Sequence, residues 1–155
     1  MYSKIMVPLD GSKVAECVLP HVEAVMSGCR AATVIFVRVA EPLPLPLVGE
    51  EVAYSPRDWD RLNEDSRAVA TAYLNNIVSG IRYEGATVKT QVLYGNPADS
   101  LADYATKNNV ELVVIATHGR SGVRRWVWGS VADRLLRSLC LPVLMVRAPG
   151  CVPGV

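Results

Sequence analysis

The sequence predicts an α/β protein, a single domain with an open five-stranded parallel sheet and helices on both faces. Five short apolar runs rich in valine and isoleucine alternate with longer stretches in which apolar residues recur at helical spacing. Alternation of this kind is typical of a mainly parallel sheet with right-handed crossovers. The 155 residues suit one domain, and neither an internal repeat nor an interdomain linker divides them.

The expected strands are short runs bounded by glycine, proline or polar residues. They span residues 5–9, 32–39, 87–93, 112–116 and 143–146. The first, fourth and fifth runs are continuously apolar, which indicates strands covered on both faces. Polar and apolar residues alternate in the third run, so we expect it to form a more exposed edge strand.

Four helices are expected between these strands, at residues 12–26, 57–81, 97–108 and 130–139. Ser12 is placed to cap the first helix, and Pro20 is expected to kink it because the proline ring clashes with the carbonyl four residues earlier. Pro97 begins the third helix at a position where no amide donor is lost. Ser130 is expected to cap the fourth helix. The buried face of the second helix is expected to carry Leu62, Val69, Tyr73 and Ile77.

Charge and cysteine content exclude several classes of function. Sixteen basic and fifteen acidic side chains give a net charge of +1, far below the basic excess of proteins that bind nucleic acid through nonspecific attraction to phosphate. The four cysteines form no CxxC pair and lie beside no histidine cluster, which disfavours zinc binding and thioredoxin-like redox chemistry. We expect free thiols in a reducing compartment.

The N-terminus and the hydropathy indicate a cytoplasmic protein without a membrane partner. Residues 1–4 lack the charged start, apolar stretch and cleavage site of a signal peptide. No segment approaches the ~18 consecutive apolar residues that a membrane span needs. Residues 148–155 are rich in proline and glycine, and we expect them to form a flexible tail.

The expected strand order, 3-2-1-4-5, places the ligand site between the first and fourth strands. In open parallel sheets, ligands bind beyond the carboxyl ends of the strands, where neighbouring crossovers diverge to opposite faces. The loop after the fourth strand is unusually long and runs through several glycines and arginines to Gly129 and Ser130 at a helix start. Amide donors at a helix start favour an anion such as phosphate. The pattern is neither a P-loop nor the dinucleotide GxGxxG motif.

Three segments of the chain carry a recognisable pattern. They are Val7-Pro8-Leu9-Asp10-Gly11-Ser12, then Ala116-Thr117-His118-Gly119-Arg120-Ser121-Gly122 with Gly129-Ser130-Val131-Ala132-Asp133, and finally Pro142–Arg147. Together they resemble the universal stress protein family over about residues 3–147. The family's nucleotide motif is Gly, two residues, Gly, nine residues, Gly, then Ser or Thr. Gly119, Gly129 and Ser130 match it, whereas Ala116 replaces the first glycine and adds a methyl group.

This resemblance implies a Rossmann-like, adenine nucleotide α-hydrolase-like domain over residues 1–147 that binds ATP, with Mg²⁺ or Mn²⁺ held through the phosphates. Asp10 and the backbone around Pro8, Leu9 and Val39 would hold the adenine and ribose. The glycine loop and the helix start would hold the phosphates. The implied nucleotide-binding residues are Pro8, Leu9, Asp10, Val39, Ala116, Thr117, His118, Gly119, Arg120, Ser121, Gly122, Gly129, Ser130, Val131 and Ala132.

The resemblance also implies a homodimer that forms through the last strand. This strand is apolar, lies at a sheet edge and invites pairing with another chain. Its expected interface residues are Val143, Leu144, Met145 and Val146. Residues 40–56, which leave the sheet directly after Val39, are expected to act as a mobile lid over the nucleotide.

The function expected from these observations is that of an ATP-binding, nucleotide-responsive stress regulator. No pair of side chains resembles a general base with an orienting partner, and no carboxylate cage for Mg²⁺ occurs, so at most slow hydrolysis is expected. The alternative is a nucleotide-free homodimeric interaction module of the same fold, in which residues 40–56 bind a partner. Structural roles also remain open, because Asp10 can brace a turn and Ser130 can cap a helix.

Overall fold

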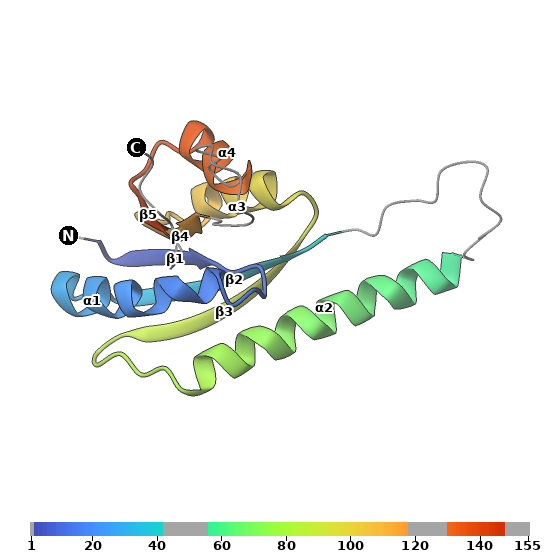
Figure 1. The fold of residues 1–155 in the computed structure, drawn as a ribbon, viewed down its shortest axis with the longest axis horizontal. Coiled ribbons are helices and arrows are strands. Elements are labelled where there is room, and N and C mark those ends of the chain that lie inside the picture. The colour runs from blue at the N-terminus through green and yellow to red at the C-terminus, as the bar shows by residue number, and fades with distance from the viewer. Residues whose placement is uncertain (1, 42–55, 118–129, 148–155) are drawn as a thin grey trace, which may run out of the picture.

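Strands and helices alternate along the chain (Figure 1), and the computed structural model describes residues 2–41, 56–117 and 130–147. The strands are β1 (Lys4–Pro8), β2 (Thr33–Ala40), β3 (Thr87–Tyr94), β4 (Leu112–Thr117) and β5 (Val143–Arg147). The α-helices are α1 (Leu19–Cys29), α2 (Pro56–Ser79), α3 (Pro97–Lys107) and α4 (Ser130–Ser138), and a short 3₁₀ helix, η1 (Ala15–Val18), precedes α1. The expected lid, apart from its ends, and the expected C-terminal tail lie outside the described residues.

The five strands form one parallel sheet in the order β3-β2-β1-β4-β5, which confirms the predicted topology. β1 lies at the centre, where Ile5 pairs with Val34 on β2 and with Leu112 on β4. The chain runs outwards from β1 to β3 and then returns to continue at β4. The carboxyl ends of β1 and β4 therefore form the topological switch point of the sheet.

Helices cover both faces of the sheet, with α1 and α2 on one face and α3 and α4 on the other (Figure 1). On one face, Ile5, Val34 and Phe36 pack with residues of α1 and α2. On the other face, Met6 and Val113 pack with residues of α3 and α4. The central strands are buried on both faces, as their continuous apolar character predicts.

The first helix differs from its prediction in where it begins. Residues 15–18 form the 3₁₀ helix η1, and α1 starts only at Leu19. Pro20 therefore lies in the first turn of α1, where its missing amide has no intrahelical partner to lose, and it does not interrupt a longer helix. Ser12 acts at the η1 turn, where its hydroxyl accepts a hydrogen bond from the Ala15 amide at 3.2 Å.

The buried face of α2 is rotated relative to the predicted one. Val69 is 60% exposed, whereas Ala70 and Leu74 are fully buried against β2 and β3. Tyr73 and Ile77 do lie on the core side, as predicted. The apolar positions in this helix allow two adjacent stripes, so the pattern alone does not decide which stripe is buried.

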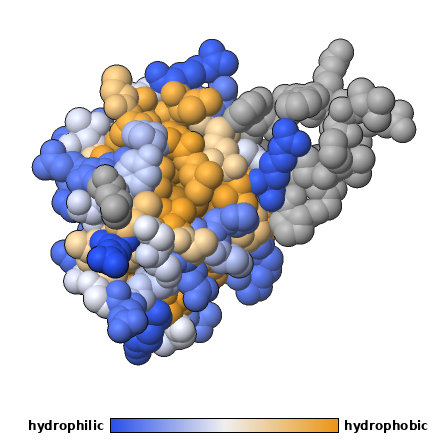
Figure 2. Space-filling view, turned by 90° about the vertical axis from the view of Figure 1, so that its left-hand side faces the viewer, coloured by the Kyte–Doolittle hydropathy of each residue, from blue (hydrophilic) through white to orange (hydrophobic). Residues whose placement is uncertain are grey.

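The two edge strands of the sheet differ in character. β3 carries exposed Thr87, Lys89 and Thr90, which confirms the prediction of a more exposed edge strand. In the described part of the sheet, β5 pairs only with β4, and its Leu144 is 37% exposed. Figure 2 presents the side of the molecule on which β5 lies in Figure 1, and hydrophobic residues gather on that surface.

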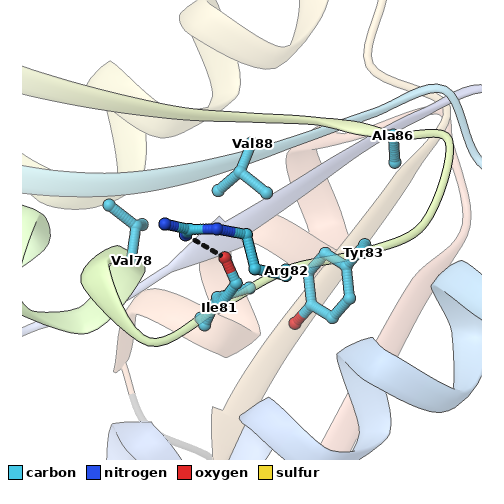
Figure 3. Close-up of a pocket in the computed structure, with 6 residues that line it drawn as sticks. All are labelled: Val78, Ile81, Arg82, Tyr83, Ala86 and Val88. Carbon is cyan, nitrogen blue, oxygen red and sulfur yellow. Dashed lines mark hydrogen bonds between the residues drawn. The ribbon is translucent and has the colours of Figure 1, made fainter.

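A small cavity of about 260 Å³ lies at the amino-terminal end of β3, next to the end of α2 (Figure 3). Its lining residues are Val78, Ile81, Arg82, Tyr83, Ala86 and Val88. The Arg82 guanidinium donates a hydrogen bond to the carbonyl of Ile81 at 2.7 Å, so it faces the segment of chain that follows α2. This cavity is at the opposite end of the sheet from the switch point.

Candidate functional site

A larger cavity, of about 610 Å³, opens at the carboxyl edge of the sheet. It lies where β1, β2 and β4 end, and residues of α2 and of the first turns of α3 and α4 complete its wall. The residues that line it are Pro8, Leu9, Asp10, Ala15, Val37, Arg38, Val39, Ala40, Glu41, Ser66, Ala70, Pro97, Leu101, Ile115, Ala116, Ser130, Val131 and Ala132. The cavity therefore occupies the switch point at which the sequence places a ligand.

Most of the predicted site residues that the structure describes meet in this cavity. These are Pro8, Leu9, Asp10, Val39, Ala116, Ser130, Val131 and Ala132. Thr117 does not line it, and its hydroxyl donates to the carbonyl of Val146 at 3.4 Å, which joins the ends of β4 and β5. The remaining predicted residues, His118, Gly119, Arg120, Ser121, Gly122 and Gly129, lie outside the described residues.

Several residues that line the cavity were not predicted from the sequence, among them Arg38, Glu41 and Ser66. A signal for Arg38 was available, because it is the one charged residue of β2 and stands near the end of that strand. Ser66 and Ala70 face the cavity because of the orientation of α2. The apolar pattern of this helix did not predict that orientation.

The walls of the cavity combine apolar side chains with a few polar groups. Val37, Val39, Leu101 and Ile115 give it apolar surfaces. Asp10, Arg38 and Glu41 carry the charges among its described lining residues, and Ser66 and Ser130 add hydroxyl groups. A mainly apolar cavity with a small number of placed polar groups is typical of a site for a small organic ligand.

The end of β1 is built to bring Asp10 to this cavity. Pro8 is the last residue of the strand, and the next amide, that of Leu9, donates to the Val37 carbonyl at 2.8 Å. Proline has no amide N–H to donate, and Pro8 stands at the cavity edge, where the hydrogen-bond ladder of the sheet ends. Beyond it, Asp10 Oδ1 accepts a hydrogen bond from the Ser12 amide at 2.8 Å. Gly11 between them has a φ of +86°, a conformation that favours glycine.

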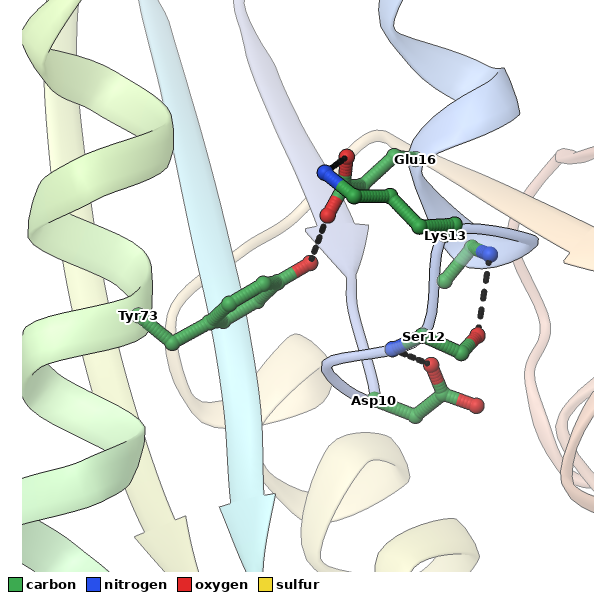
Figure 4. A network of polar contacts seen from close by, with 6 residues as sticks. Asp10, Ser12, Lys13, Glu16 and Tyr73 are labelled. Carbon is green, nitrogen blue, oxygen red and sulfur yellow. Dashed lines mark hydrogen bonds and ion pairs between the residues drawn. The ribbon is translucent and has the colours of Figure 1, made fainter.

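A set of polar contacts connects this loop to α2 (Figure 4). Lys13 Nζ lies 2.9 Å from Glu16 Oε2, and the Tyr73 hydroxyl donates to Glu16 Oε1 at 3.4 Å. Burial, together with the nearby Glu16 carboxylate, raises the pKa of Tyr73 to about 12, and Arg38 opposes this shift. The Arg38 guanidinium lies over the same ring, 5.0 Å from its centroid.

The starts of α3 and α4 form another part of the wall. The Asn96 side chain caps α3 by accepting hydrogen bonds from the amides of Ala98 and Asp99, and Pro97 occupies the first turn as predicted. Ala132, in the first turn of α4, is buried and lines the cavity. Both helix starts thus lie at the carboxyl edge of the sheet.

The described residues contain neither a cluster of metal ligands nor a helix suited to cross a membrane. Within residues 2–41, 56–117 and 130–147, no group of three or more His, Cys, Asp or Glu side chains is arranged to hold a metal ion. None of the helices in these same ranges has the length and apolar character required to cross a membrane.

The fold and the cavity together define a small doubly wound α/β protein with a ligand-sized cavity at its topological switch point. The family model described as "Universal stress protein family" matches residues 1–147, and the chain belongs to this family.

Two curated relatives come from Methanocaldococcus jannaschii. Universal stress protein MJ0531 is 28% identical over 151 residues, which cover 96% of this chain and 84% of the relative. Universal stress protein MJ0577 is 26% identical over 158 residues, which cover 95% of this chain and 96% of the relative.

Solved structures share the fold. The structure of protein MJ0577 superposes with a TM-score of 0.78 at 25% identity and covers 97% of this chain and 99% of that one. A universal stress protein in complex with cAMP has a TM-score of 0.57 at 20% identity over 95% of this chain and 98% of its own. A family protein from Arabidopsis thaliana with AMP bound has a TM-score of 0.61 at 16% identity over 96% of this chain and 93% of its own.

Proposed function

We propose that the chain binds ATP in the cavity at the carboxyl edge of its sheet and acts as a nucleotide-responsive regulator. The observation that carries this proposal is the cavity of about 610 Å³, in which predicted residues from the ends of β1, β2 and β4 and from the start of α4 meet. Members of the same family with the same fold have been solved with cAMP and with AMP, which supports an adenine nucleotide as the ligand class.

The arrangement of the lining suggests how the nucleotide lies. We assign the adenine to the apolar surface around Val39 and Ile115, and the ribose hydroxyls to the Asp10 carboxylate. The phosphates are assigned to the start of α4 at Ser130–Ala132, where helix amides favour an anion. The predicted phosphate residues Gly119, Arg120, Ser121, Gly122 and Gly129 complete this assignment from the sequence alone.

A divalent ion enters this proposal only with the phosphates. Asp10 and Glu41 are the carboxylates among the described lining residues, and two such groups do not form a protein cage for Mg²⁺. We therefore assign Mg²⁺ or Mn²⁺ to the phosphate oxygens. The proposed role is nucleotide binding with at most slow hydrolysis.

The proposal includes a homodimer formed through β5. Its outer edge is unpaired in the described sheet, and the exposed Leu144 adds apolar surface beside it. Two-fold antiparallel pairing of two such edges would satisfy their backbone groups. We place the dimer in the cytoplasm, where thiols such as those of Cys17, Cys29 and Cys140, which form no disulfide, stay reduced.

Native mass spectrometry of protein purified without added nucleotide tests the ligand class. The proposal predicts a fraction whose excess mass matches an adenine nucleotide, which is released on denaturation and identified by its ultraviolet spectrum and chromatography. Protein that carries no nucleotide and gains none from added ATP, ADP or AMP would support the nucleotide-free interaction module instead.

A further inference from the structure

Arg38 is an unusual residue for its place in the fold. It lies in β2, between Val37 and Val39, whose side chains pack on the α3 and α4 face of the sheet. Its own side chain lies on the opposite face, over Tyr73 of α2, and it is half-buried. A charged group in a buried strand needs compensating contacts, because leaving water costs free energy. The contacts that it makes therefore indicate its role.

The Arg38 guanidinium lies close to two groups. One is the Tyr73 ring, 5.0 Å from Arg38 Cζ to the ring centroid. The other is Gly11, where a Cβ would come within 2.9 Å of Cζ. The guanidinium thus fills the space that a side chain at residue 11 would need. The φ of +86° favours glycine at this position, and a side chain there would also displace the guanidinium.

The same ring also fixes the far side of the loop. The Tyr73 hydroxyl donates to Glu16, and Glu16 pairs with Lys13 (Figure 4). Residues 10–16 are therefore connected to α2 at one end through Glu16 and are supported near Gly11 by Arg38. Asp10, which adjoins Gly11, takes its place at the cavity from this supported turn.

We propose that Arg38 is a positioning residue of the ligand cavity: braced on Tyr73, its guanidinium supports the turn at Gly11 and so orients the Asp10 carboxylate toward the ribose of the bound nucleotide. This inference rests on the proposed function for its ligand, but the support of the turn is a property of the unliganded protein. It extends the site to β2 and α2, beyond the residues of the nucleotide motif.

The flat shape of the guanidinium distinguishes this role from a charge that attracts phosphate. Lysine keeps the positive charge, but its compact ammonium cannot lie flat against a ring and a backbone turn. A positioning role therefore predicts that R38K loses as much affinity for the nucleotide as R38Q does. Direct attraction of the phosphates predicts that R38K retains the affinity and that R38Q loses more affinity for ATP than for adenosine.

Two measurements test the proposal, with R82Q at the opposite end of the sheet as the matched control. Without nucleotide, amide hydrogen exchange of the segment 10–16 is expected to be faster in R38Q and R38K than in the wild type and R82Q, because the turn has lost its support. By calorimetry, both Arg38 variants are expected to bind ATP and adenosine with about tenfold weaker affinity. In a D10N background, the same Arg38 substitutions are expected to cause little further loss, which a general loss of structure would not produce.

The outcomes separate the two proposals. Unchanged exchange of residues 10–16, or full affinity in R38K, would overturn the positioning role while leaving nucleotide binding intact. Equal losses in the wild-type and D10N backgrounds would also overturn it. Wild-type protein that binds neither ATP nor adenosine would overturn the proposed function and the ligand role of Arg38 together, and the exchange measurement would still decide whether Arg38 supports the turn.

Discussion

Arg134 on α4 donates a hydrogen bond to Asp99 in the first turn of α3, with 2.9 Å between Nη2 and Oδ1. The two residues are 35 positions apart in the sequence. The pair joins two helices whose first turns both line the cavity at the switch point. It is an ion pair on the surface, since both side chains are more than half exposed.

Because this pair is exposed, it is expected to contribute little to the free energy of unfolding. We predict that R134Q lowers that free energy by less than about 1 kcal/mol in urea denaturation, with a smaller effect at high salt. R137Q, which breaks the pair of Arg137 with Asp133 inside α4, is the control and is expected to behave similarly. A loss of several kcal/mol in R134Q alone would show that the contact between α3 and α4 depends on this pair.

Leu74 and Val69 provide a direct test of which face of α2 is buried. Leu74 is fully buried, and we predict that L74A lowers the free energy of unfolding by roughly 2–5 kcal/mol, because it removes apolar contacts and leaves a cavity. V69A changes a residue that is 60% exposed and is expected to alter stability by less than about 0.5 kcal/mol. Equal losses in urea denaturation of the two variants would contradict the observed orientation of α2.

The raised pKa of Tyr73 predicts a loss of stability at high pH. Its pKa is about 12 in the folded protein against 10.0 for an unperturbed tyrosine, mainly because of burial and the Glu16 carboxylate. The neutral hydroxyl is therefore favoured by folding. This contribution is fully present below about pH 10, where the unfolded chain also keeps its proton, and is lost as the pH rises toward 12.

Y73F provides the measurement, because it keeps the ring and removes the ionisable group. Between about pH 10 and about pH 12, the urea midpoint of the wild type is expected to fall more steeply than that of Y73F. Since Tyr73 is partly exposed, the difference should be of the order of 1 kcal/mol. If the two midpoints fall in parallel, Tyr73 titrates normally and its hydroxyl is not shielded.

The proposed dimer is tested at Leu144, an exposed apolar residue on the edge strand β5. A lysine at this position would have to lose water in a paired edge, so we predict that L144K is a monomer at concentrations at which the wild type is a dimer. V69K introduces the same charged side chain at an exposed apolar position of α2, away from β5, and should remain dimeric. Sedimentation velocity measures both variants, and a dimeric L144K would place the interface elsewhere.

The strands and their order were predictable from the sequence because burial on both faces leaves a strong local pattern. The predicted runs 5–9 and 112–116, which correspond to β1 and β4, are apolar at every position, and the alternation of strands with helical stretches restricts the topology. The exposed edge strand β3 was recognisable from its alternating polar residues in the same way.

The errors have physical causes that a local pattern does not contain. Pro20 is compatible both with a kink and with a helix start, and only the 3₁₀ turn before Leu19 decides between them. The buried face of α2 depends on how the helix packs on β2 and β3, because its apolar residues form two adjacent stripes. Arg38 was not predicted to line the cavity, because its side chain is placed by Tyr73 and Gly11, which are distant from it in sequence.

Calorimetric titration of ATP into the wild type, D10N and D103N tests nucleotide binding at the switch point. Asp103 on α3 is exposed and does not line the cavity, so D103N makes the same chemical change outside the proposed site. We predict that the wild type and D103N bind ATP with the same affinity. D10N is predicted to bind roughly 10- to 100-fold more weakly, as expected for the loss of a hydrogen bond to a charged group. Equal affinity in all three proteins, or no binding by the wild type, would contradict the account.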